Sequence, residues 1–143
     1  MKLIPILPDL VATARVAGSE FVTGVCSSTM AIYPPGGPVM PWIGYLAEVD
    51  GEWVGSCAFK SPPVDGAVEI AYFTFPGHEG RGHAARMARE LVALAREHGA
   101  AQIRAQTLPE PNASTRILEK LGFRWAGATM HPEDGTVWEW QLP

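Results

Sequence analysis

The hydrophobic period of the chain changes at Pro76, and this change constrains the fold more than any other feature. Residues 68–75, VEIAYFTF, are β-branched and aromatic and alternate between two faces, which predicts a β-strand. Beyond Pro76, apolar side chains recur at helical spacing over residues 84–95, which predicts an amphipathic helix of about five turns that ends near Gly99. A strand followed by a long helix is typical of an α/β layered domain.

The rest of the chain predicts further strands and helices. A hairpin is expected over residues 43–60, with its turn at Asp50-Gly51, and a second hairpin over residues 123–142. Between them we expect a strand at 101–108 and a helix that begins near residue 112 and ends at Gly122. Closer to the N-terminus, we expect a helix from Asp9 to about Glu20, and then a short helix soon after residue 20. This order predicts a mixed sheet flanked by helices.

Composition limits the class of protein. The 143 residues, 47% hydrophobic and 18% charged, fit a single domain over residues 1–143 with a sizeable core. The formal net charge of −4 argues against non-specific binding to nucleic acid. Pro5 and Pro8 interrupt the first apolar residues, so we expect neither a signal peptide nor a membrane span, and a cytoplasmic protein follows. Cys26 and Cys57 are expected to be reduced packing residues.

A glycine-rich stretch, GHEGRGHAARM at residues 77–87, fits the pattern G-x-G-x-x-[G/A] of loops that wrap a phosphate at the start of a helix. A P-loop would need a lysine followed by Ser or Thr, which this stretch lacks. A dinucleotide loop would begin where the strand ends and would need an acid about 20 residues on; the acid near that distance, Glu97, falls within the predicted helix. The pyrophosphate of coenzyme A remains, because Gly80 and Gly82 allow close approach and Arg81 adds positive charge. A plain glycine loop before a helix is the alternative.

Two motifs in this order resemble the GNAT acetyltransferase superfamily, and above all its branch that acetylates protein N-terminal amines, those of ribosomal proteins among them. The family's loop reads [Q/R]-x-x-G-x-[G/A]; Gly82 and Ala84 match it, and Glu79 departs from it at the first position. The family's later signature, N-x-x-S-x-r-v-l-E-K-l-G-F, is matched over residues 114–123, STRILEKLGF, and Asn112 lies one place from the family's Asn.

The resemblance covers residues 44–142 well and the first 43 poorly. It implies a single α/β domain with a mixed, mostly antiparallel sheet. The fourth strand, 68–75, and the fifth, 101–108, would splay apart to admit the pantetheine arm of acetyl-CoA. Acetyl-CoA is the implied cosubstrate, and no metal is implied. The residues implied in binding it are Phe73, Thr74, Glu79, Gly80, Arg81, Gly82, His83, Ala84 and Asn112.

The implied reaction is direct attack of a primary amine, on a protein N-terminus or a small molecule, on the acetyl thioester. Glu69 is the leading candidate for the base that removes the amine proton, and a purely structural carboxylate is the alternative. The backbone N–H of Thr74 is expected to stabilise the oxyanion. No tyrosine follows Tyr72, so Ser114 is the candidate acid for the departing thiolate, with a helix cap as its alternative.

Other features leave alternatives open. A non-catalytic acyl-CoA-binding module on the same fold is the competing function, and turnover would separate it from an enzyme. His78 and His83 flank the glycine loop and are expected at the surface or in packing, with a base as the alternative. His98 is expected to end the long helix, where its charge suits the dipole, and His131 could rim the substrate channel. Family members are often homodimers, so a homodimer is a further expectation. The acceptor cannot be identified from the sequence, because the family builds that pocket from the segment that matches least.

Overall fold

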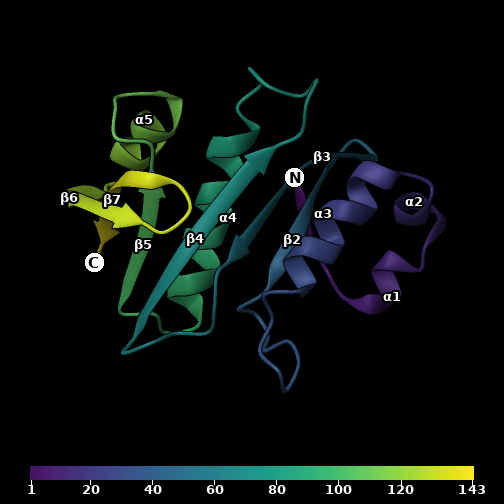
Figure 1. Cartoon of the computed structure of the whole chain (residues 1–143). Helices are drawn as coiled ribbons and strands as arrows, with labels where there is room; N and C mark the ends of the chain where they lie inside the picture. The colour runs from purple at the N-terminus through teal and green to yellow at the C-terminus, as the bar shows by residue number, and fades with distance from the viewer.

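A computed structural model describes all 143 residues and contains one seven-stranded sheet (Figure 1). Every neighbouring pair of strands is antiparallel except β4 and β5, which are parallel. In sheet order the strands are β1 (Lys2–Pro5), β2 (Gly44–Val49), β3 (Glu52–Phe59), β4 (Ala67–Thr74), β5 (Gln102–Thr107), β7 (Gly135–Leu142) and β6 (Arg124–His131). The mixed, mostly antiparallel sheet expected from the sequence is therefore confirmed.

Five helices cover the two faces of the sheet. They are α1 (Pro8–Val11), α2 (Ala14–Ala17), α3 (Glu20–Met30), α4 (His83–Glu97) and α5 (Ala113–Lys120). The larger core cluster joins α4 and α5 to strand residues that include Tyr45 and Ala47, whereas a smaller cluster joins α2 and α3 to Leu46. Because successive side chains of a strand point to opposite faces, the two clusters lie on opposite sides of the sheet. No helix is long and apolar enough to cross a bilayer.

The sheet opens between β4 and β5. The two strands pair over only three positions, which end at Glu69 and Arg104. Beyond that point β4 stays bonded to β3 and β5 to β7, while the two strands diverge from each other, as Figure 1 shows. The expected splay between the fourth and fifth strands is confirmed, and one edge of β4 is left without a partner strand in the middle of the sheet.

The N-terminal segment differs from the expectation. The single helix predicted from Asp9 to about Glu20 is wrong, because α1 and α2 are one-turn helices separated at Thr13. The hydroxyl of Thr13 donates to the carbonyl of Leu10, a local bond that competes with helix propagation. Leu7 occupies the N-cap position of α1 without a side-chain hydrogen bond to the helix, and Asp9 lies in the first turn. β1 was not expected from the sequence, whereas the short helix expected soon after residue 20 is present as α3.

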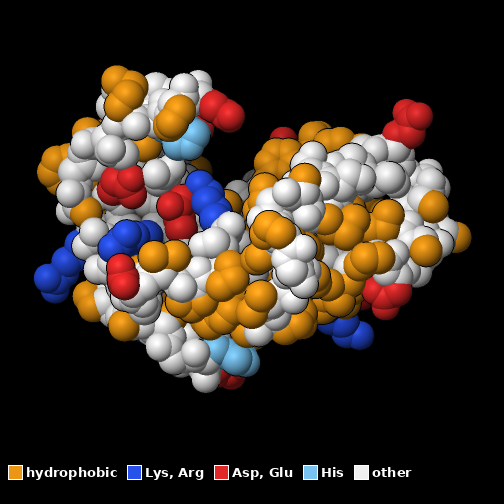
Figure 2. Space-filling view, turned by 60° about the horizontal axis from the view of Figure 1, so that its bottom comes forward, with side chains coloured by type: hydrophobic (Ala, Val, Ile, Leu, Met, Phe, Trp, Pro, Cys, Tyr) orange, Lys and Arg blue, Asp and Glu red, His pale blue; other side chains and the backbone are white.

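On the face seen in Figure 2, the basic side chains are unevenly distributed. In Figure 2, hydrophobic side chains spread over the half that carries α1 to α3, whereas most lysines and arginines in view gather on the half that carries α5 and β5 to β7.

Cys26 and Cys57 are free and buried, which confirms that they are packing residues.

Candidate functional site

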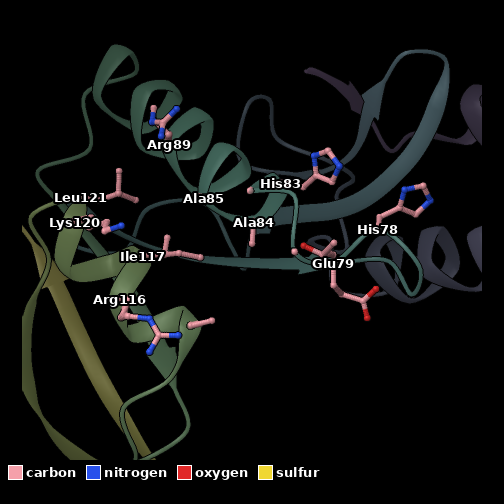
Figure 3. A pocket seen from close by; sticks show the side chains of 14 residues that line it. His78, Glu79, His83, Ala84, Ala85, Arg89, Arg116, Ile117, Lys120 and Leu121 are labelled. Carbon is pink, nitrogen blue, oxygen red and sulfur yellow. The ribbon is translucent and has the colours of Figure 1, made fainter.

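A cavity of about 460 Å³ lies where β4 ends, between α4 and α5. Thr74, the glycine-rich loop and the first turn of α4 form one side, and α5 forms the other. Figure 3 shows His83, Ala84 and Arg89 on α4, and Arg116, Ile117 and Lys120 on α5. The cavity therefore adjoins the point where β4 and β5 stand apart.

The loop brings bare backbone to this cavity. Gly80 and Gly82 have φ angles of 77° and 80°, a left-handed conformation that favours glycine. A Cβ atom at either position would meet nothing within 4 Å, so the loop faces open space. Gly82 is the N-cap of α4 and no side chain caps this helix, so its first backbone N–H groups remain for another acceptor. Such a helix start favours an anion through its donors and its dipole.

Glu79, where the chain departs from the family's loop, is bonded to its own loop. Its Oε1 accepts a hydrogen bond of 2.6 Å from the backbone N–H of Gly77. Bonds from its own backbone N–H and from that of Gly77 lower the pKa of the Glu79 carboxyl. The carboxylate is exposed at the rim of the cavity, and its bond to Gly77 opposes rotation toward the helix start.

Two histidines line the same cavity. The ring centroids of His78 and His83 are 6.4 Å apart, and the Nδ1 atom of each is buried without a hydrogen-bond partner. His83 is only 7% exposed. Burial lowers the pKa of His83, and the neighbouring charges of His78 and Arg81 lower it further, so the imidazole is neutral near pH 7. An anion placed beside it would reverse part of that shift.

Three cations that the sequence analysis missed complete the cavity. Arg89 of α4, and Arg116 and Lys120 of α5, line it, and none of them forms an ion pair. Arg116 and Lys120 are four residues apart, so they share one face of α5. That spacing was visible in the sequence, but only the position of α5 beside α4 shows that the face meets the glycine loop.

A second polar contact crosses from β4 to α5. The hydroxyl of Tyr72 lies 2.9 Å from Oγ of Ser114. Burial raises the pKa of the Tyr72 phenol, and the Ser114 hydrogen bond partly opposes that rise, so the phenol keeps its proton near neutral pH. From the sequence, Ser114 and not Tyr72 was the candidate acid, because no tyrosine follows Tyr72. The position of Tyr72 on the same face of β4 as Thr74 was the sequence feature that could have indicated its role.

Ser114 does not cap its helix. Asn112 is the N-cap of α5: its Oδ1 accepts from the backbone N–H of Thr115 at 2.9 Å, and Oγ1 of Thr115 accepts from the backbone N–H of Asn112. The alternative reading of Ser114 as a helix cap is therefore wrong. The Ser114 hydroxyl makes no bond to the start of α5 and is therefore available for its hydrogen bond with the phenol of Tyr72.

Glu69 lies far from the glycine loop. Its Oε2 is 2.5 Å from Nζ of Lys60, an ion pair whose geometry does not make a well-directed hydrogen bond. The Glu69 side chain is 25% exposed and belongs to the paired part of β4. Five residues of strand, about 16 Å, separate it from Thr74.

The backbone of β4 alternates between its two neighbours. Glu69 and Phe75 bond to β3 through Lys60 and Val54. Since an antiparallel strand turns alternate residues toward its partner, the even-numbered residues of β4 present their N–H and C=O groups to the opening. Thr74 is among them, whereas the backbone of Phe73 faces β3.

The structure thus brings together some of the expected cofactor residues and not others. Thr74, Glu79, Gly80, Gly82, His83 and Ala84 line the cavity. Arg81 is exposed outside it, the side chain of Phe73 is on the other face of the sheet, and the Asn112 carbonyl serves α5.

The family comparison agrees with this geometry. The model of the acetyltransferase (GNAT) domain matches residues 23–124, more than half of the chain. The chain belongs to the GNAT acetyltransferase family. The match begins inside α3, so the family extends into a segment that the sequence analysis matched only poorly. None of the curated proteins compared matches the chain.

Solved structures of GNAT proteins share the fold. A GCN5-related N-acetyltransferase from Kribbella flavida is 19% identical, with a TM-score of 0.65 over 85% of this chain and 76% of that one. A putative acetyltransferase from Salmonella typhimurium, solved with its cofactor acetyl-CoA, is 20% identical, with a TM-score of 0.63 over 84% and 70%. A ribosomal-protein-alanine N-acetyltransferase from Brucella melitensis is 20% identical, with a TM-score of 0.61 over 70% and 67%. Identities this low show a common fold and leave the acceptor open.

Proposed function

We propose that this protein transfers the acetyl group of acetyl-CoA to a primary amine, either a protein N-terminus or a small molecule. The observation that carries the proposal is the open edge of β4, which leads into a cavity formed by an uncapped helix start. An extended arm can add to such an edge as a strand does, while the helix start holds a phosphate. The acetyl-CoA bound to the related Salmonella typhimurium protein supports the choice of ligand.

Each part of the cavity has a role in holding acetyl-CoA. The N–H groups that follow Gly82 would bind the pyrophosphate, with the buried His83 beside them. The unpaired cations Arg89, Arg116 and Lys120 would neutralise further phosphate charge. The backbone groups of Thr74 and of the other even-numbered residues of β4 would bond the pantetheine amides along the opening.

Three groups of this chain would act on the reaction. Glu69 would accept the proton of the attacking amine through a chain of water molecules, because about 16 Å of strand separates it from Thr74. A backbone N–H of the unpaired stretch of β4, for which Thr74 is our candidate, would donate to the oxygen as the amine nitrogen bonds the acetyl carbon. As the carbon–sulfur bond breaks, Tyr72 would pass its proton to the departing thiolate, and Ser114 would hold the phenol in place.

The test measures binding and turnover separately. Calorimetry with CoA reports the cofactor site, and release of free thiol from acetyl-CoA in the presence of an amine panel reports transfer. We expect both. Tight CoA binding without thiol release for any amine, N-terminal peptides included, would overturn the enzymatic proposal and favour a non-catalytic acyl-CoA-binding module. Absence of CoA binding would overturn both.

A further inference from the structure

A groove of about 520 Å³ lies between α3, the middle of β3 and the C-terminal end of β4. Three successive turns of α3 contribute Phe21, Gly24 and Ser28, and the strands contribute Ser56 and Phe73. Residues four apart on a helix share one face, so a single face of α3 forms this wall.

The groove adjoins the proposed reaction site. Phe73 and Thr74 are neighbours on β4, so their side chains point to opposite faces of the sheet. Thr74 lines the cavity between α4 and α5, whereas Phe73 lines the groove. An acceptor in the groove would therefore reach the opening between β4 and β5 from the side opposite the phosphates.

Two aromatic rings line the groove and are exposed. Phe21 of α3 and Phe73 of β4 are 48% and 49% exposed, and because both line the groove they form a shared apolar surface. Both rings contact the buried Phe75, at centroid distances of 5.0 and 5.8 Å, which holds them in place. A wall of this kind favours an apolar or aromatic ligand.

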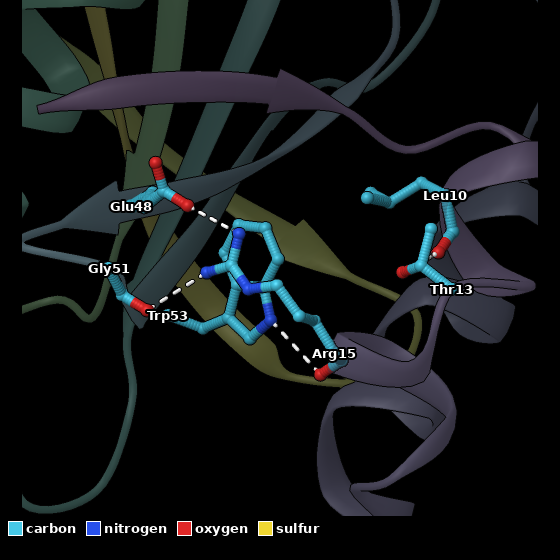
Figure 4. Close-up of polar contacts among 6 residues, drawn as sticks. All are labelled: Leu10, Thr13, Arg15, Glu48, Gly51 and Trp53. Carbon is cyan, nitrogen blue, oxygen red and sulfur yellow. Dashed lines mark hydrogen bonds and ion pairs between the residues drawn. The ribbon is translucent and has the colours of Figure 1, made fainter.

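The segment before α3 is pinned to the sheet, so the groove is formed in advance. The Arg15 guanidinium of α2 lies 4.1 Å from the ring centroid of Trp53 and bonds Glu48 at 2.6 Å and the carbonyl of Gly51 at 2.9 Å (Figure 4). Trp53 in turn donates from Nε1 to the carbonyl of Arg15. These contacts fix α2, and α3 begins three residues after α2 ends.

The charge of the groove fits one ammonium group. Glu20 is the only ionisable side chain that lines it, and no lysine or arginine does. A single carboxylate can attract a single cation. The further ammonium groups of a polyamine or an aminoglycoside would find no second carboxylate in the groove, where only the hydroxyls of Ser28, Thr29 and Ser56 could accept from them.

We infer that the acceptor is a small monoamine carried on an aromatic or branched apolar body, bound against Phe21 and Phe73 with its ammonium group toward Glu20. The inference rests on the proposed transfer reaction, and it names the class of substrate. In the reaction the ammonium that enters beside Glu20 first loses one proton to the base and becomes the nucleophilic amine. Its nitrogen then bonds the acetyl carbon as the carbon–sulfur bond breaks. The new amide nitrogen gives up a second proton, which replaces the one that Tyr72 passes to the departing thiolate.

A first experiment compares acceptors. With acetyl-CoA saturating, kcat/KM is measured for 2-phenylethylamine, spermidine, kanamycin and an alanine-initiated tetrapeptide, and calorimetry measures 2-phenylethylamine binding to the CoA-saturated protein. We expect 2-phenylethylamine to lead by about tenfold or more. Thiol release with no such preference overturns the inference and leaves the transfer reaction intact. Binding of 2-phenylethylamine without thiol release for any acceptor overturns the transfer reaction and leaves the groove as a binding site, and absence of binding overturns the inference.

A second experiment fills the groove. A side chain at Gly24 would enter open space, since a Cβ there meets nothing within 4 Å. Gly24→Leu should raise the KM for 2-phenylethylamine by about tenfold or more, leave the CoA dissociation constant unchanged, and keep or raise the melting temperature, because leucine favours helix over glycine. Ser27→Leu adds the same side chain to an exposed position of α3 outside the groove and should leave the KM unchanged. An unchanged KM in Gly24→Leu, or an equal rise in Ser27→Leu, would remove the groove from the acceptor site.

Discussion

The glycine that starts α4 gives the sharpest test of the cofactor site. We predict that Gly82→Glu abolishes useful CoA binding while the protein still folds. Two properties of the site separate the effect on binding from the effect on folding. Gly82 has a φ of 80°, so the cost to the backbone is limited to this one position. No atom lies within 4 Å of the Cβ position, so the added side chain enters the cavity and not the core. A residue other than glycine in this conformation costs about 1–2 kcal/mol of stability, which a domain of ordinary stability tolerates.

The effect on binding is larger than the effect on folding. A carboxylate about 5 Å from one phosphate charge, at an effective dielectric constant of about 20, is repelled by about 3 kcal/mol. At about 1.4 kcal/mol per factor of ten, the CoA dissociation constant should rise by about 100-fold or more. The side chain also covers the first N–H groups of the helix, which adds to the loss.

Gly99→Glu is the matched control. Gly99 has a φ of 82° and the same empty surroundings, so the substitution carries the same backbone cost. It lies at the other end of α4, whose 15 residues span about 22 Å, beyond the reach of an unscreened charge at physiological salt. Calorimetry with CoA and thermal melts of both variants make the comparison. A folded Gly82→Glu protein whose affinity is within threefold of the parent, or equal weakening in Gly99→Glu, would refute the phosphate site.

Three further predictions address the chemistry. Glu69→Gln should lower turnover by about 100-fold with CoA affinity unchanged; a rate within threefold of the parent at every pH would leave Glu69 as a structural partner of Lys60. Ser114→Ala should slow turnover and leave stability unchanged, whereas Asn112→Ala, which removes the cap of α5, should cost about 1 kcal/mol of stability. Normal turnover in Ser114→Ala would show that Ser114 has no role beside the thiolate. CoA should bind more tightly as the pH falls from 8 toward 6, because the bound anion raises the lowered pKa of His83 and binding then takes up a proton. The slope should become shallower in His83→Phe, and calorimetry that finds a flat profile in the parent protein, or the same slope in the variant, would contradict it.

Local patterns predicted the parts of the fold that depend on local physics. The alternation in β4, the period of α4 and the turn at Asp50-Gly51 all appear in the structure where the sequence indicated them. β1 was not predicted because it pairs with β2, which lies at least 40 residues further along the chain, and because its four residues are too few to show an alternating pattern. The resemblance to GNAT proteins, and no local pattern, supplied the opening between β4 and β5.

The candidate site shows the same division. The glycine loop was readable because a phosphate loop needs particular residue types at a fixed spacing. The contact between Tyr72 and Ser114 spans 42 residues, and nothing local indicates which hydroxyl will meet the phenol. The ion pair of Glu69 with Lys60 crosses from β4 to the end of β3, and the sequence left open whether that carboxylate was paired. Contacts between side chains that are distant in the sequence depend on tertiary packing, so they could not be predicted from one sequence.

The gap between β4 and β5 gives this protein an edge strand inside its own sheet. An exposed row of backbone donors and acceptors is a template for intermolecular pairing, and most proteins protect their edges with charge, bulges or covering segments. Here the free edge of β4 lies on an interior strand, and the Tyr72–Ser114 contact ties β4 to α5 without pairing that edge with β5. A ligand lying along that edge would protect it in the way a neighbouring strand does, so loss of ligand would expose an aggregation-prone surface at the centre of the fold.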